Sequence, residues 1–221
     1  MSDVSSRPPH TGGRPTPEGS AQLDRHVLEV ATALFIKQGF AATSLERIAR
    51  EAACSKASLY RRYASKEDLF RAVVAARGTL LLEAAGAVEA SSTDPLVATR
   101  EISAFFLDFM LRPETLEAYR IVIADGHRIA FFVEDMMQTI VEPFVATLSR
   151  QIKAAADAGR IHSTDHDETT RILISLFVGW PLQNTMLGLN QLHDPQTRAR
   201  FFERSWQIFT SGICAREKEG A

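Results

Sequence analysis

The sequence predicts an all-α fold, in which a small N-terminal unit of three helices is followed by a larger helical domain. Apolar residues recur at helical spacing (i, i+3, i+4, i+7) along most of the chain, and no segment shows the sustained alternation of a β-strand. Helix-starting Ser, Thr and Asp and helix-ending Gly and Pro separate these stretches. At 221 residues, the chain is long enough for both units to have an apolar core.

The charge is distributed unevenly, although the formal net charge of the chain is only −2. Residues 21–71 hold nine Lys and Arg against six Asp and Glu, whereas residues 72–221 hold fourteen against nineteen. A basic first unit and an acidic second unit indicate that only the first meets a polyanion. The composition, 45% hydrophobic and 24% charged, excludes a chain that is disordered throughout or strongly polybasic.

The two cysteines, Cys54 and Cys214, lie far apart and have no metal-ligand spacing, so we expect neither a structural disulfide nor a metal site. The longest nearly unbroken apolar stretch, 172–182, is too short to cross a bilayer, and no apolar signal region is found near the first residue. These features favour a cytoplasmic protein with no membrane partner.

Residues 1–20 are expected to form a disordered arm, because they hold four of the nine prolines and lack apolar periodicity. Arg14 on such an arm could enter a minor groove, although a solvated tail without a role is the more common case. The first helix is expected from Gln22 to Gly39, where a left-handed C-cap belongs, with Phe40 folding back on its apolar stripe.

Two short helices follow, at about residues 44–63. Thr43 or Ser44 can cap the first of them in a capping box with Glu46, and Ser55 can cap the second. The second is rich in small and basic side chains, which is typical of the reading helix of a helix-turn-helix motif. Ser65 then begins a fourth helix, whose free N–H groups form a phosphate clamp with the ammonium group of Lys66.

This region resembles the DNA-reading domain of the tetracycline-repressor (TetR) family of transcriptional regulators. The resemblance covers about fifty residues in order and register: Ala33-Leu34-Phe35, Gly39-Phe40, Thr43-Ser44, Ile48-Ala49, Ser55-Lys56, Ser58-Leu59-Tyr60 and Lys66-Glu67-Asp68-Leu69-Phe70. It implies a DNA-binding domain at 21–70 and a helical ligand-binding and dimerisation domain at 71–221. Ala53 stands where the family usually has glycine, which implies a conformational cost of about 1 kcal/mol.

The resemblance also implies roles for individual residues of the reading unit. The phosphate binders would be Thr43, Tyr60, Arg62 and Lys66, and the groove-facing residues would be Lys56, Ala57, Ser58 and Arg61, with the helix-starting Ser44 and Ser55 beside them. The alternative is that the cations form a merely solvated basic face and that Tyr60 belongs to the core.

In the second domain, helices are expected at 72–88, 96–111, 114–124, 129–141, 144–158, 168–189 and 195–215, with kinks or restarts at Pro143 and Pro181. No catalytic constellation is present, so we do not expect an enzyme. Asp165, His166 and Asp167 cluster at a helix start, which favours capping over metal binding.

The resemblance, which extends to the AefR-like type of C-terminal domain, implies a homodimer held by the last two helices. The residues expected at that interface are Leu173, Phe177, Trp206 and Phe209. It also implies a repressor that a small, mostly apolar ligand releases from its operator. Candidate pocket residues, for which core packing is the alternative, are Phe105, Phe109, Tyr119, His127, Phe131, Met136, Met137, Trp180 and Met186.

The expected partners are therefore double-stranded operator DNA, a second copy of the chain and a small-molecule effector, with no cofactor. The alternative function is a regulator of the same family that has no small effector and is controlled by a protein partner or by its own level.

Overall fold

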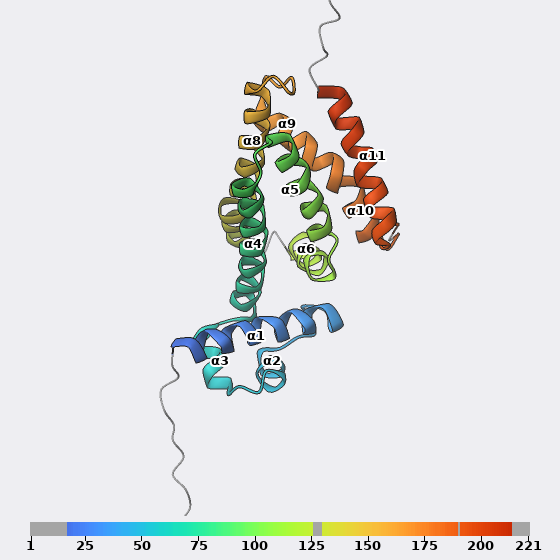
Figure 1. Ribbon diagram of the computed structural model, residues 1–221. Helices are drawn as coiled ribbons and strands as arrows, with labels where there is room; N and C mark the ends of the chain where they lie inside the picture. Colours follow the sequence, from blue (N-terminus) through green and yellow to red (C-terminus); the bar gives the residue numbers. More distant parts are fainter. Residues whose placement is uncertain (1–16, 126–129, 190, 214–221) are drawn as a thin grey trace, which may run out of the picture.

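The computed structural model describes residues 17–125, 130–189 and 191–213, and all the elements in these ranges are helices. Figure 1 shows a small unit of three helices below a taller helical domain, with one long helix connecting them. The predicted all-α fold is therefore confirmed. Within the described ranges, no helix combines the length and apolar character needed to cross a membrane.

The small unit consists of α1 (Pro17–Gln38), α2 (Leu45–Glu51) and α3 (Lys56–Arg62), and it packs on the first turns of α4 (Lys66–Ser91). Three serines start these helices, because each side-chain oxygen accepts a backbone N–H three residues later: Ser44 from Arg47, Ser55 from Ser58 and Ser65 from Asp68. The cap of α2 is thus Ser44 and not Thr43.

Helix α1 begins at Pro17, five residues before the predicted start at Gln22. Its first turns are held by the third helix, since the Arg62 guanidinium donates a hydrogen bond to Ser20 Oγ at 2.8 Å. The sequence pattern missed this because the first turns of α1 carry no apolar stripe. Arg14, in the predicted arm, lies outside the described residues.

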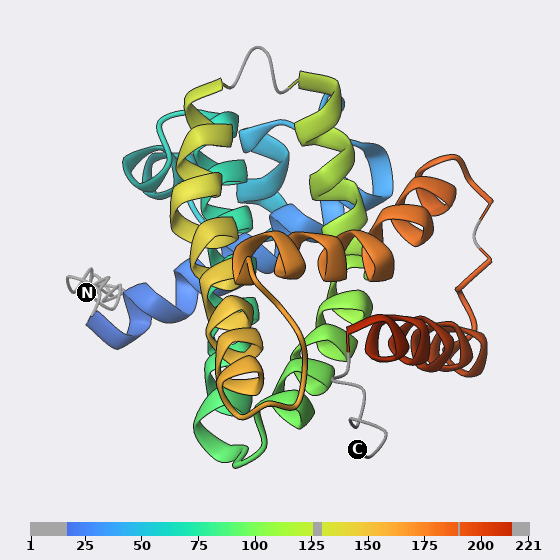
Figure 2. The same ribbon diagram turned by 90° about the horizontal axis from the view of Figure 1, so that it is seen from above.

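The larger domain surrounds the upper part of α4, and in Figure 2 α11 lies along one side of it. Asp94, Asp165 and Asp194 each accept a backbone N–H at a helix start, so the predicted acidic caps are confirmed. The helices are α5 (Pro95–Met110), α6 (Pro113–Asp125), α7 (Ala130–Met136), η1 (Met137–Val141), α8 (Glu142–Asp157), α9 (His166–Ile174), η2 (Ser175–Gly179), α10 (Trp180–Met186) and α11 (Pro195–Ile213).

The sequence predicts a kink or a restart at Pro143 and at Pro181, and the structure shows no restart at either proline. Each follows a π-helical turn, η1 or η2, by two residues, and the helix continues through both turns. A proline lacks the N–H that the i−4 carbonyl needs, and its ring collides with that carbonyl. A π-helical turn just before the proline is wider than an α-helical turn. It leaves room for the ring and tolerates the missing hydrogen bond, so the helix is not interrupted.

Four phenylalanines join the two domains. The Phe70 ring of α4 lies 6.0 Å from Phe35 and 5.4 Å from Phe40 in the small unit, and 5.5 Å from Phe132 of α7. Phe40 therefore folds back as predicted. Because Ile121 of α6 also belongs to this core, the small unit is packed directly against the larger domain.

We predict that Ala53→Gly stabilises the protein. Ala53 has a φ of +50°, in the left-handed region that costs a non-glycine residue about 1–2 kcal/mol. Glycine removes this strain but loses about 0.5–1 kcal/mol through its greater freedom in the unfolded chain. We expect a net gain of about 0.5–1 kcal/mol and a rise in Tm of about 1–4 °C by calorimetry. As a control, Ala52→Gly, at a φ of −81°, should lower Tm. A lower Tm for Ala53→Gly would contradict the prediction.

Candidate functional site

The α2–α3 unit presents an exposed face that carries most of the predicted DNA contacts. Leu59 is buried and fixes α3 against the core. The side chains that remain exposed are Ser44, Ser55, Lys56, Ala57, Tyr60 and Arg61, while Ser58 is half-buried. Lys56 and Arg61 form no salt bridge within the described part of the chain, so their charges are available to a partner. The side chain of Ala57 is small, so it leaves the start of α3 open to a close approach by a partner.

Tyr60 connects the two helices of this face. Its hydroxyl donates a hydrogen bond to Glu46 Oε1 at 2.7 Å, and Glu46 lies on α2. The bond stabilises the carboxylate, which lowers the pKa of Glu46, and it raises the pKa of Tyr60. Glu46 therefore holds Tyr60 in place, and its carboxylate also interacts with the side chain of Ser44, the N-cap of α2. The negative charge of the Glu46 carboxylate also repels phosphate groups that approach this face.

Arg62 turns inward, which argues against the predicted phosphate contact. Its Nε lies 2.8 Å from a carboxylate oxygen of Asp24, and its side chain is only 13% exposed. Together with the bond to Ser20, this pair ties α3 to α1. Asp24 is far from Arg62 along the chain, and only the crossing of α1 and α3 brings them together, so the sequence alone does not reveal this pair.

Thr43 is also internal and its side chain cannot reach a phosphate. Its hydroxyl donates to Gly39 O at 2.8 Å and accepts from the Gln38 amide at 2.9 Å, and the residue is 2% exposed. Thr43 thus stabilises the turn between α1 and α2. Its predicted role as a phosphate binder is corrected to a structural one.

Lys66 is engaged by the chain itself. Its ammonium donates to Phe40 O at 2.7 Å and lies 4.3 Å from the centre of the Phe40 ring. It secures the turn after α1 on the start of α4. A phosphate clamp at this position requires the ammonium to leave a carbonyl oxygen, so the structure revises the prediction for Lys66.

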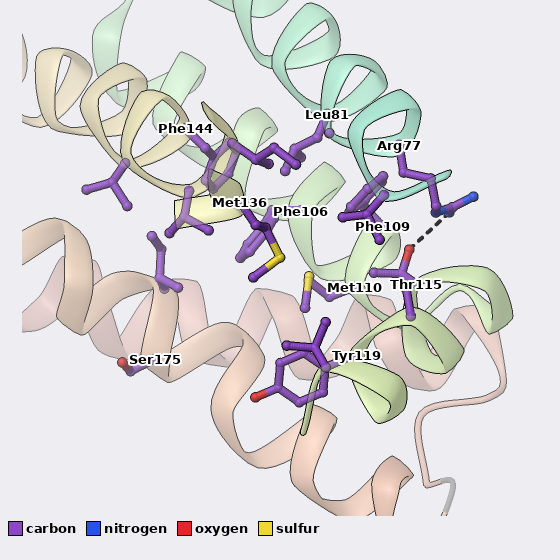
Figure 3. A pocket seen from close by; sticks show the side chains of 18 of the residues that line it. Arg77, Leu81, Phe106, Phe109, Met110, Thr115, Tyr119, Met136, Phe144 and Ser175 are labelled. Carbon is purple, nitrogen blue, oxygen red and sulfur yellow. Dashed lines mark hydrogen bonds between the residues drawn. The ribbon is translucent and has the colours of Figure 1, made fainter. Parts of the chain in front are cut away.

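A cavity of about 490 Å³ lies inside the larger domain, beside α4. Figure 3 shows Phe106, Phe109, Met110, Met136 and Phe144 around it, with Arg77 and Thr115 together at one end. Its volume falls within the range of small-molecule sites, and its walls are mostly apolar. The full lining consists of Val74, Arg77, Gly78, Leu81, Phe106, Phe109, Met110, Thr115, Ala118, Tyr119, Val122, Met136, Ile140, Val141, Phe144, Val145, Arg171, Ile174 and Ser175.

The predicted pocket residues divide into three groups. Phe109, Tyr119 and Met136 line the cavity. Four do not line it: Phe105, Met137, Met186 and Trp180, whose ring stacks on Phe201 at 5.8 Å. His127 and the side chain of Phe131 lie outside the described residues.

α4 contributes a cavity wall that was not predicted from the sequence: Val74, Arg77, Gly78 and Leu81. Their spacing of i, i+3, i+4 and i+7 marks one helix face, which was the available signal. Gly78 lets η1 approach, since a Cβ there would lie 2.3 Å from Ile140 Cδ1. A side chain at this position would push Ile140, which lines the cavity.

Most of the predicted dimer residues are used within one protomer. Leu173, Phe177 and Phe209 are at most 5% exposed, and Trp206 is half-buried, stacked 6.4 Å from Phe177. They form the core that joins η2 to α11 and are not available to a second copy. The neighbouring surface instead exposes other large apolar residues: Ile172, Trp180, Leu187, Leu189 and Ile208.

The Asp165-His166-Asp167 cluster is distributed over separate partners. Asp165 caps α9, His166 Nδ1 lies 3.1 Å from Ser163 Oγ, and Asp167 accepts from Ser149. The predicted capping role of Asp165 is confirmed. Among the described residues, no group of three or more His, Cys, Asp or Glu side chains is placed to hold a metal ion.

Known proteins match this chain in both domains. Residues 27–73 match the family described as bacterial regulatory proteins, tetR family, and residues 98–211 match the C-terminal domain of AefR-like transcriptional repressors. The HTH-type transcriptional regulator YvkB of Bacillus subtilis (strain 168) is 24% identical over 199 residues, which cover 87% of this chain and 97% of that protein.

Solved structures share the fold. A TetR-family transcriptional regulator from Mesorhizobium loti MAFF303099 has a TM-score of 0.78 at 22% identity, covering 89% of this chain and 98% of its own. The flavonoid-responsive regulator FrrA has a TM-score of 0.65 at 24% identity, covering 89% of this chain and all (100%) of its own.

We predict that Arg61→Ala and Lys56→Ala weaken operator binding by about 1–3 kcal/mol each and relax base preference, because each removes an exposed cation from the reading face. Arg62→Ala should leave base preference unchanged and destabilise the fold by about 1–2 kcal/mol, because it leaves Asp24 unpaired.

Fluorescence anisotropy on operator fragments selected from random DNA measures the first effect, and thermal unfolding measures the second. The assignment is wrong if folded Arg62→Ala loses as much base preference as Arg61→Ala.

Proposed function

Because the chain belongs to the TetR family of DNA-binding transcriptional regulators, we propose that it is a cytoplasmic repressor, which binds its operator as a homodimer and is released by a small ligand. The observation that carries the ligand part of this proposal is the apolar cavity of about 490 Å³ beside α4. The relative FrrA is named for its response to flavonoids, so small-molecule control has a precedent in this fold.

Operator recognition rests on α3. A two-fold dimer presents two such helices to successive turns of the major groove, and base edges are read by the side chains at the start of each helix. Lys56 supplies an exposed donor at the start of α3 and Arg61 supplies one in its last turn, and the small side chain of Ala57 permits close approach. Phosphate contacts come from the exposed side chains of Ser44, Ser55 and Tyr60, whose hydroxyl groups are uncharged.

The cavity is coupled to the reading unit by two helices. α4 contributes the cavity wall at Arg77 and Leu81 and the inter-domain core at Phe70, within one continuous helix of 26 residues. α6 contributes Thr115 and Tyr119 to the cavity and also contacts α1. A ligand that moves either helix changes the placement of α3, and in a dimer it changes the spacing of both reading helices.

The exposed apolar residues on the α9–α11 side support the dimer. Five of the eleven exposed large hydrophobic residues in the described part of the chain lie between Ile172 and Ile208, and exposed apolar surface of this kind is a candidate interaction site. Trp180 is 47% exposed, Ile172 58% and Ile208 56%, and these residues belong to α10, α9 and α11. These residues replace the buried Leu173, Phe177 and Phe209 as the proposed interface.

We predict that Trp180→Glu or Ile208→Glu gives a folded monomer with greatly weakened operator binding. A buried carboxylate in the interface is costly, and a single reader contacts only one half-site. The matched control is Leu80→Glu, on a residue of α4 that is 54% exposed; α4 and α11 lie on opposite sides of the larger domain in Figure 1, and this variant should remain a dimer. Light scattering after size exclusion reports the mass. Dimers at both interface variants would refute the assignment.

We also predict that Val145→Trp keeps operator binding but abolishes the response to ligand. Val145 lines the cavity yet belongs to none of the apolar core clusters, so a larger side chain there fills the space with little disturbance of the core. The measurement is operator release during titration of a metabolite panel, compared with the unmodified chain. A response that survives in Val145→Trp would place the ligand elsewhere. If no compound acts on the unmodified chain, control by a protein partner or by protein level is supported instead.

A further inference from the structure

The charged groups in the cavity wall are all of one sign. Two arginines, Arg77 and Arg171, line the cavity, and no Asp or Glu is found among the described lining residues. Apart from Thr115, Tyr119 and Ser175, the remaining lining side chains are apolar. An apolar ligand alone gives no reason for guanidinium groups in such a wall, whereas a ligand with an anionic group does.

Arg77 is the more enclosed of the two and its charge is incompletely neutralised. Its side chain is 17% exposed, Nη2 donates to Thr115 Oγ1 at 3.0 Å, and the nearest Glu114 oxygen lies 3.6 Å away. Its buried Nε has no hydrogen-bond partner. Burial lowers the pKa of Arg77, which is the cost of holding a cation with little compensation. A buried donor without an acceptor is unfavourable until a ligand supplies one.

The guanidinium of Arg112, which does not line the cavity itself, strengthens the positive potential near Arg77. The guanidinium carbon of Arg77 lies 5.4 Å and that of Arg112 5.9 Å from the centre of the Phe109 ring, so two cations lie close to one cavity-lining ring. Glu114, the carboxylate paired with Arg77, is 36% exposed and therefore partly screened by water. Two cations against one solvated carboxylate leave a net attraction for an anion.

We propose that the effector is an amphipathic carboxylic acid, whose carboxylate pairs with Arg77 and whose apolar body fills the cavity between Phe106, Met136 and Phe144. At about 30 Å³ for each water-sized group, 490 Å³ accommodates roughly 16 non-hydrogen atoms. Medium-chain alkyl acids and bicyclic aryl acids both have this size and this chemistry. Figure 3 shows the geometry, with Arg77 and Thr115 at one end and the apolar side chains beyond them.

Binding at Arg77 has a direct consequence for the reading unit. Arg77 on α4 holds Thr115 and Glu114 of α6, so a ligand carboxylate competes with the α4–α6 connection. Since α6 contacts α1, the displacement reaches the small unit. The effect of the ligand on the small unit rests on the proposed function, whereas the binding of an acid at Arg77 does not.

Calorimetric titration of the full chain tests the inference with two matched pairs of probes: dodecanoate against dodecan-1-ol, and 2-naphthylacetate against 2-naphthylethanol. We expect the acid of at least one pair to bind about tenfold or more tightly than its alcohol, equivalent to about 1.4 kcal/mol. The pair that shows the effect distinguishes an alkyl from an aryl body. Equal affinity of acid and alcohol in both pairs, or no binding of any probe, overturns the proposal.

Variants locate the carboxylate. Arg77→Met should remove the preference for acid while alcohol binding persists, and Arg77→Lys should restore part of it because the cation is kept. Arg120→Met, which removes an exposed arginine of α6 outside the cavity, is the matched control and should keep the preference. Loss of the preference in Arg171→Met but not in Arg77→Met overturns the assignment to Arg77. If Arg77→Met does not fold, the comparison of Arg77→Lys with the unmodified chain decides.

Operator release is measured separately with the same probes. Tight, Arg77-dependent binding without release from the operator supports the acid site and contradicts the proposed ligand-released repressor. Release by the alcohols as readily as by the acids, at matched occupancy, supports the repressor and contradicts a role for the carboxylate.

Discussion

Phe70 packs at once on Phe35 and Phe40 of the small unit and on Phe132 of α7, and the relation between the two domains depends on this packing. Because interiors are close-packed, these rings cannot slide past one another gradually. Phe70 is also part of α4, a helix of 26 residues and therefore about 39 Å long. The same helix thus packs against the small unit in its first turns and lines the cavity from Val74 to Leu81. A change in the cavity has a physical route to α3 that needs no long chain of side-chain contacts.

The cations of the reading unit serve two purposes. Arg62 and Lys66 are bound to Asp24 and to the Phe40 carbonyl, and so they assemble the unit from segments far apart in the sequence. Lys56 and Arg61 stay exposed and remain available to DNA. This division follows from burial, because a cation near the core is stable only with a partner, whereas a solvated one needs none. The net positive charge of the region therefore overstates the number of cations that can contact DNA.

The same constraint, that a buried cation needs a partner, applies to Arg77 in the cavity wall, whose charge is incompletely neutralised. Arg77 is largely buried with one unpartnered nitrogen, in a wall whose lining residues are mostly apolar. Such a group is costly in a merely structural core and favourable in a site that receives an anion. Gly78, the next residue, allows Ile140 to approach α4, so the same turn of α4 both positions the charge and brings a wall of the cavity close.

The sequence by itself determined the all-α fold and the capped short helices of the small unit, because helical periodicity and capping are local properties written within a few residues. The type of the second domain was indicated by the resemblance to AefR-like C-terminal domains, which residues 98–211 match. The sequence also indicated correctly that Ala53 would adopt a strained turn. Only the tertiary structure decided which side chains face a partner. Phe177 and Phe209 resemble interface residues in the sequence, but the crossing of η2 and α11 buries them, and the crossing of α1 and α3 turns Arg62 inward. The cavity wall of α4 was equally hidden. A helix face can be recognised from its spacing, but the empty space beside it is created by how α5, α6, α7, α8 and α9 and the turns η1 and η2 pack around it.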